Sequence, residues 1–129
     1  MLKTLIQSYR LKTHRILYRG FAMSETEFVS SWGEFSQNLV SHFDSKYNTD
    51  ELFEDVEELD ELVKIVTNKG QVFVINRQVP NREIWYSSPL SGPSHYRYDE
   101  ATGRWINKAD REFYEVFDSD MDKILHSNK

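Results

Sequence analysis

The chain contains no cysteine. This excludes disulfides, thiol catalysis, and any zinc site or iron–sulfur cluster held by the chain's own thiolates. The fold must therefore rest on a hydrophobic core, and 129 residues with 39% hydrophobic and 14% aromatic residues can build one. Glycine and proline are also scarce, at five and three residues, and no glycine-rich phosphate loop is present. No apolar run is long enough to predict a membrane-spanning helix.

Basic and acidic residues are unevenly distributed. Residues 1–22 hold five of the 16 basic residues and none of the 21 acidic ones, so residues 23–129 carry a net charge of −10. A basic, acid-free leader with scattered apolar residues is typical of an organelle-targeting segment. We therefore expect a targeting leader over 1–22 and one folded domain over 23–129. The acidic domain argues against a nucleic-acid partner and favours a cationic partner or a metal ion.

Two segments have helical periodicity. Ser24 and Glu27 form a Ser-x-x-Glu capping box at the start of the first. The apolar residues that follow are spaced by three or four, which predicts a helix of about 20 residues; they are Phe28, Trp32, Phe35, Leu39 and Phe43. A second apolar stripe predicts a helix from about Asp110 to His126.

Between these helices the sequence predicts an antiparallel meander. The expected strands cover 53–59, 62–67, 71–76, 82–87, 95–98 and 104–107, and the segment "PLSGP" (89–93) is expected to be a loop. Strands flanked by a helix at each end favour an α+β fold, a two-layer sandwich in which both helices pack on one face of an antiparallel sheet. The other face of the sheet would be open to solvent.

Trp85 is the candidate docking residue. Ile84 and Tyr86 point to one face of their strand and Trp85 to the other, so Trp85 faces the open side if Ile84 faces the helices. An exposed tryptophan is a favoured hot spot of protein interfaces. The alternative is that Trp85 tucks against Pro89 or Tyr96 at the rim of the sheet.

The segment 44–61 holds nine acidic residues and one lysine. Clustered carboxylates bind hard cations through oxygen ligands, although such a run also suits a solvated surface. The four histidines are scattered and fall in no metal or catalytic motif. The sequence therefore predicts no catalytic residues.

The segment "FVINRQVPNREIWYSSPLSGPSHY" (73–96) resembles the signature of the frataxin family. Gly103-Arg104-Trp105 is similar to the G-x-W that follows it in the family, and the likeness extends over about residues 24–126. The resemblance implies the same helix–sheet–helix sandwich.

The resemblance also implies a function. Frataxins look like mitochondrial iron-binding accessory proteins of iron–sulfur cluster assembly, which regulate a complex of cysteine desulfurase and scaffold protein and donate or chaperone ferrous iron. For this chain it implies weakly bound Fe²⁺ or Fe³⁺, no membrane partner, a monomer or iron-dependent oligomer, and a location in the mitochondrial matrix or a mitosome. A ferroxidase that stores iron and a metal-independent binding module remain as alternatives.

Site residues follow from the same resemblance. The implied metal ligands are Glu25, Glu34, Asp44, Asp55 and Glu57. The implied partner-binding residues are Asn76, Gln78, Asn81, Trp85 and His95. His95 stands where the family usually has arginine, so a titratable imidazole replaces a fixed guanidinium and we expect an altered partner contact there.

Overall fold

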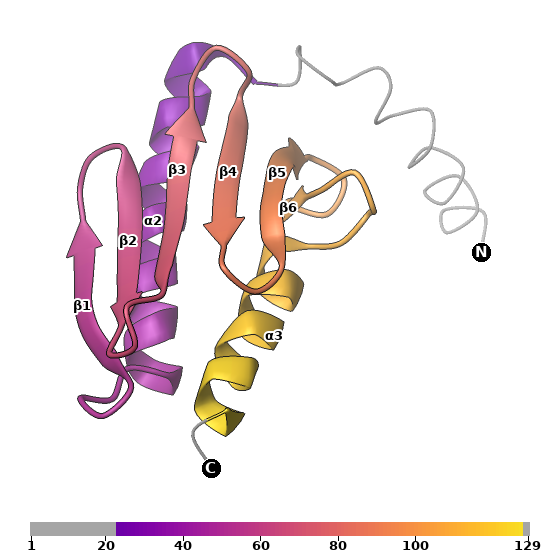
Figure 1. The fold of residues 1–129 in the computed structure, drawn as a ribbon. Coiled ribbons are helices and arrows are strands. Elements are labelled where there is room, and N and C mark those ends of the chain that lie inside the picture. Colours follow the sequence, from indigo (N-terminus) through magenta and orange to yellow (C-terminus); the bar gives the residue numbers. More distant parts are fainter. Residues whose placement is uncertain (1–22, 128–129) are drawn as a thin grey trace.

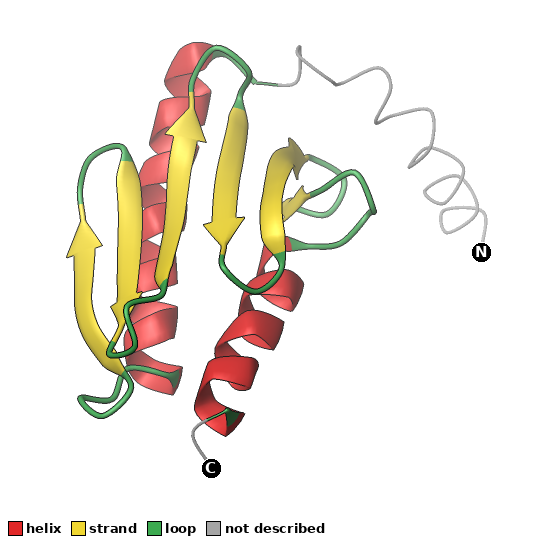
Figure 2. Cartoon of the chain, viewed as in Figure 1, coloured by secondary structure: helices red, strands yellow, loops and turns green. Residues whose placement is uncertain are grey.

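The computed structural model describes residues 23–127, so the predicted leader over 1–22 lies outside the described residues. The elements in chain order are α2 (Glu25–Lys46), β1 (Phe53–Glu58), β2 (Leu62–Thr67), β3 (Val72–Gln78), β4 (Glu83–Ser88), β5 (Gly92–Asp99), β6 (Arg104–Ile106) and α3 (Phe113–His126). The six strands form one antiparallel sheet in sequence order. Both helices lie behind this sheet in Figure 1, and no described element covers its front (Figure 2). The predicted α+β two-layer sandwich is confirmed.

Helix α2 begins as the sequence predicts. The Ser24 side chain accepts a hydrogen bond from the Glu27 amide at 3.1 Å, and Glu27 Oε1 accepts one from the Ser24 amide at 3.0 Å. This reciprocal pairing satisfies two amides at the helix start. The apolar stripe of α2 is buried against the sheet, and Trp32 also donates a 2.8 Å hydrogen bond to the backbone oxygen of Asp60.

Helix α3 starts at Phe113, later than the expected Asp110. Asp110 has a φ of 61°, in the left-handed region that a right-handed helix excludes. The Asn107 side chain accepts a hydrogen bond from the Arg111 amide and closes a turn there. Glu112 then caps the helix, because its side chain accepts a hydrogen bond from the backbone amide of Tyr114, the second residue of α3.

Strand β5 begins earlier than expected. Residues 89–93 were predicted to be a loop and 95–98 a strand, but pairing with β4 already starts at Gly92, opposite Ser88. The Ser88 hydroxyl accepts hydrogen bonds from two amides in the connection, including that of Ser91 at 3.0 Å. These bonds close the turn in three residues, so the sheet extends further toward this end than the sequence suggested.

The core lies between the sheet and the two helices. Alternate residues of the strands point into it, and all are at most 1% exposed: Val63, Ile65, Phe73, Ile75, Ile84, Tyr86 and Tyr96. They meet the aromatic stripes of α2 and α3, where Phe113 and Phe117 stack with ring centroids 5.5 Å apart. Because alternate side chains occupy the core, the intervening side chains of the same strands are displayed on the open face.

Candidate functional site

Three predicted partner-binding residues form one row across the open face. Asn76 on β3 is directly opposite Trp85 on β4, which in turn is directly opposite His95 on β5. Side chains at directly opposed positions of antiparallel strands are close neighbours on one face. We call Asn76, Trp85 and His95 the central row.

The other two predicted partner-binding residues lie beside this row. Gln78 is two positions along β3 from Asn76, and its side-chain Nε2 donates a hydrogen bond to Asn76 Oδ1 at 3.4 Å. Asn81 is exposed in the connection between β3 and β4. The structure therefore gathers the five residues on neighbouring strands and one turn.

Trp85 lies on the open face but is half-buried there. Its indole stacks on the His95 imidazole with ring centroids 4.1 Å apart and an interplanar angle of 4°. The indole nitrogen donates a hydrogen bond to Glu83 Oε1 at 2.9 Å. Of the two alternative neighbours of Trp85, Tyr96 is wrong, because it is fully buried on the opposite face, paired with the core residue Ile84; a contact with Pro89 stays a prediction. Trp85 is covered by its open-face neighbours instead.

Glu83 is a residue that the sequence argument missed. Its side chain is 12% exposed, its second oxygen accepts a 2.9 Å hydrogen bond from Arg97 Nε, and its first lies 3.9 Å from His95 Nδ1. Strand alternation could have identified it, because residues two apart in a strand lie on the same face: Glu83 is two residues before Trp85, and Arg97 is two residues after His95. The pairing of β4 with β5 then brings the two pairs together.

The predicted metal ligands are widely spread. Glu25 is in the first turn of α2, Glu34 near its middle and Asp44 in its last turn, and all three are exposed. At 1.5 Å per residue the first and last of them are about 28 Å apart along the helix axis. No group of three or more histidine, aspartate or glutamate side chains within residues 23–127 is placed to hold one ion.

The two predicted ligands on β1 share the open face. The pairing of β1 with β2 skips one residue, which sets Asp55 opposite Val66 and Glu57 opposite Lys64. Such a bulge changes the alternation of a strand, and here it leaves Asp55 exposed at the edge of the sheet. Lys64 is the cross-strand neighbour of Glu57, and a positive charge at this position disfavours a second cation beside it.

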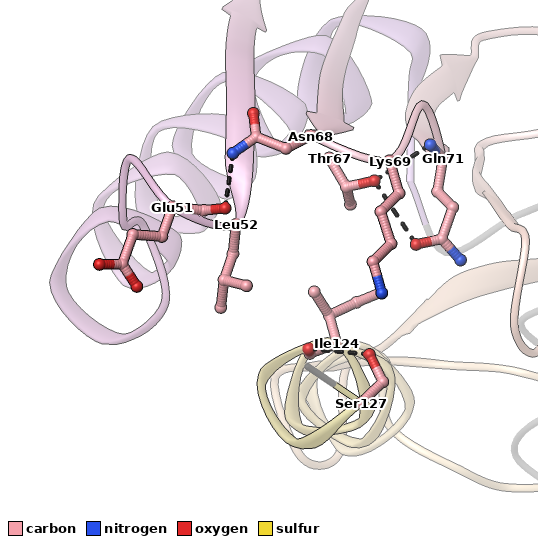
Figure 3. A pocket seen from close by; sticks show the side chains of 8 residues that line it. All are labelled: Glu51, Leu52, Thr67, Asn68, Lys69, Gln71, Ile124 and Ser127. Carbon is pink, nitrogen blue, oxygen red and sulfur yellow. Dashed lines mark hydrogen bonds between the residues drawn. The ribbon is translucent and has the colours of Figure 1, made fainter. Parts of the chain in front are cut away.

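A cavity of about 300 Å³ lies away from these residues (Figure 3). It is lined by Glu51, Leu52, Thr67, Asn68, Lys69, Gln71, Ile124 and Ser127. These residues come from the segment before β1, the end of β2 and its connection to β3, and the C-terminal end of α3 with the residue that follows it. It contains none of the predicted ligands or partner-binding residues.

A family model described as a frataxin-like domain matches residues 21–127. The chain belongs to the frataxin family. The family predicted from the resemblance of residues 73–96 is thereby confirmed. In the part of the chain that the structure describes, no helix of this frataxin-family protein has both the length and the apolar character needed to cross a membrane.

Curated relatives carry frataxin names. The chain is 47% identical over 66 residues to "Frataxin, mitochondrial" of Dictyostelium discoideum, a match that covers 51% of this chain and 34% of the relative. It is 45% identical over 58 residues to the mitochondrial frataxin homolog of Drosophila melanogaster, covering 43% and 30%. These matches span about a third of each relative's own length. A 29% identical match to Caenorhabditis elegans mitochondrial frataxin covers 82% of this chain and 80% of the relative.

Solved structures share the fold. Frataxin from Psychromonas ingrahamii aligns with a TM-score of 0.64 at 21% identity, over 75% of this chain and 87% of that one. Trimeric frataxin from Saccharomyces cerevisiae, complexed with ferrous iron, aligns with a TM-score of 0.59 at 22% identity, over 77% and 86%. At these identities the likeness concerns the fold.

Proposed function

We propose that this frataxin-family chain is an accessory protein of iron–sulfur cluster assembly that docks on a complex of cysteine desulfurase and scaffold protein. The observation that carries the proposal is the central row, which sets Asn76, Trp85 and His95 side by side on the face that no described element covers. A tryptophan flanked by polar side chains on a rigid sheet has the composition of an interface hot spot. The Trp85 indole is ordered before any partner arrives, which lowers the entropic cost of docking.

We further propose that the protein holds iron weakly, as cargo, on Glu25, Glu34, Asp44, Asp55 and Glu57. Exposed carboxylates are hard oxygen ligands for Fe²⁺ and Fe³⁺, and a yeast relative of the same fold was solved with ferrous iron. The spacing of these carboxylates along α2 and β1 favours several weak sites over one tight site. A ferroxidase centre would bring several carboxylates around one position, so the arrangement favours the accessory role.

We propose a mitochondrion, or an organelle derived from one, as the location. Three curated relatives described above carry the word mitochondrial in their names. The basic, acid-free segment 1–22 has the composition of an import leader. The protein would then act in the mitochondrial matrix or in the equivalent compartment of a mitosome.

Binding to a purified cysteine desulfurase–scaffold complex, with and without ferrous iron, tests the docking proposal. We expect the wild type to bind and Trp85→Ala to bind more weakly. Val29→Ala, a truncation of an exposed apolar side chain on α2, is the matched control and should bind as the wild type does. No binding by the wild type in either condition, or equal binding by Trp85→Ala, would overturn the proposal.

A further inference from the structure

We propose that Glu83 is a positioning residue of the docking surface, which holds the Trp85 indole by its edge while His95 covers one of its faces. The inference rests on the proposed docking function of Trp85. It assigns a role to a carboxylate that is neither a predicted iron ligand nor a predicted partner contact.

The geometry uses both oxygens of the carboxylate. Oε1 accepts the indole N–H of Trp85 at 2.9 Å, and Oε2 accepts the guanidinium Nε–H of Arg97, also at 2.9 Å. A carboxylate that is hydrogen-bonded through both oxygens has little freedom to rotate, so the two bonds together fix its orientation. The Glu83 side chain is 12% exposed, which shields both bonds from water. Hydrogen bonds to an ionised carboxylate are among the stronger ones in proteins.

The same contacts restrict the indole in two directions. The hydrogen bond to Glu83 fixes the edge of the ring, and the parallel His95 imidazole at 4.1 Å fixes the plane. A side chain that is ordered before binding loses less conformational entropy on binding. Arg97 also offsets the negative charge of Glu83. A partner that docks on the open face therefore meets aromatic rings beside a neutralised carboxylate, although the protein as a whole is acidic.

The first test uses the free protein. In nuclear magnetic resonance spectra the indole N–H signal of Trp85 is assigned by its loss in Trp85→Phe, and its hydrogen exchange is compared between wild type and Glu83→Leu. We expect faster exchange in Glu83→Leu, because the acceptor is gone. The Trp32 indole, bonded to a backbone oxygen, is the internal control and should not change. Unchanged exchange at Trp85 would overturn the proposal.

The second test is a double-mutant cycle on binding to the desulfurase–scaffold complex. Glu83→Leu should weaken binding about tenfold in the wild-type background and add no further loss in a Trp85→Ala background. Glu83→Gln keeps an oxygen that can accept the indole N–H, so it should restore affinity to within about threefold of wild type. Glu115→Leu removes an exposed glutamate–arginine pair away from the open face, formed between Glu115 on α3 and Arg111 just before it at 3.0 Å, and should leave binding unchanged.

The outcomes separate the two proposals. If Trp85→Ala binds as the wild type does, the docking function is wrong, and the exchange measurement still decides whether Glu83 holds the indole. If Trp85→Ala weakens binding and Glu83→Leu does not, the positioning role is wrong and docking stands. Arg97→Met provides a second variant should Glu83→Leu fail to fold. It frees one oxygen of Glu83 and should weaken binding measurably, though less than Trp85→Ala does; affinity equal to wild type would overturn the positioning role.

Discussion

The hydroxyl of Tyr86 donates a 2.7 Å hydrogen bond to Oδ2 of Asp120. The same carboxylate oxygen accepts a second hydrogen bond from Ser91, also at 2.7 Å, and Asp120 is 1% exposed. These bonds join α3 to β4 and to the turn that follows it. The turn at the end of the open-face strands is therefore anchored through the sheet to the helix layer behind it.

Removing this carboxylate should destabilise the protein. Asp120→Ala leaves two hydroxyl donors without their acceptor in a buried site, and we expect a loss of about 2–4 kcal/mol in the free energy of unfolding. Urea denaturation measures it. Asp122→Ala, at an exposed position of the same helix, should stay within about 0.5 kcal/mol of wild type. Equal stability of the two variants would show that the anchor contributes nothing.

High pH should also destabilise the fold. Burial, followed by the hydrogen bond to Asp120, raises the pKa of Tyr86, and burial raises the pKa of Tyr96, Tyr114 and Tyr47. Since the neutral phenol is the form that folds, this stability is fully present below the unfolded-state pKa of about 10 and is lost as pH rises above it. At pH values well above 10, each such tyrosine lowers the free energy of unfolding by about 1.4 kcal/mol for every further pH unit.

Thermal melts from pH 8 to 11 check this dependence. The melting temperature should be flat up to about pH 9.5 and then fall, because tyrosines of the unfolded chain begin to ionise there. Tyr86→Phe removes one buried phenol, so its melting temperature should fall less steeply with pH than that of the wild type. A wild type that melts equally at pH 9 and pH 11 would contradict the prediction.

Local patterns predicted the layers of the fold. The capping box at Ser24 and the three-and-four spacing after it define α2, and the strands alternate because one side of the sheet is buried. The order helix, meander, helix then leaves few ways to bury the apolar faces. These features depend on residues close together in the chain, which is why they can be predicted from the sequence.

Other features depend on contacts that no single segment specifies. The late start of α3 follows from a left-handed Asp110 and from the turn closed by Asn107. The stacking of Trp85 on His95 and the two bonds of Glu83 follow from the register between β4 and β5. That register depends on how the Ser88 hydroxyl closes the intervening turn. Strand alternation places each side chain on a face but does not choose its neighbours on the next strand.

Iron binding should be distributed over several carboxylates. A single alanine substitution at any of the five predicted ligands should lower iron affinity by less than about threefold, because no three carboxylates of the described residues converge on one ion. Replacing all five together should abolish binding. Anaerobic titration with ferrous iron measures both, and Glu115→Ala on α3 is the control. One tight site that a single substitution removes would contradict this picture.

The segment 1–22 should direct import and then be removed. A fluorescent protein fused after residue 22 should enter the organelle, because the leader is basic and free of acidic residues. A fusion to residues 23–129 alone is the control and should stay in the cytosol. N-terminal sequencing of the organelle protein should give a start near Ser24. Imported protein that retains Met1 would contradict removal, and a cytosolic full-length fusion would contradict targeting.

Trp85→Ala should affect binding more than folding. The indole is half-buried on the open face, where it stacks on His95 and donates one hydrogen bond to Glu83, so we expect a loss of about 2 kcal/mol in the free energy of unfolding, less than for a core tryptophan. Binding to the desulfurase–scaffold complex should weaken by about 2 kcal/mol or more. Trp32→Ala is the matched control, since Trp32 is 2% exposed and its truncation should cost about 3–5 kcal/mol of stability.

Asn76→Ala and Gln78→Ala test whether the surface acts as a unit. Each removes polar contacts next to Trp85, and each should weaken binding by about 1 kcal/mol while leaving the melting temperature nearly unchanged. Thermal melts and binding isotherms on the three open-face variants and Trp32→Ala separate the two effects. If Trp85→Ala melts as far below wild type as Trp32→Ala does and yet binds normally when folded, then Trp85 belongs to the core and the open face is not the docking surface. If Trp85→Ala weakens binding in the isotherm and lowers the melting temperature far less than Trp32→Ala does, the indole acts mainly on the partner, as its place in the central row predicts.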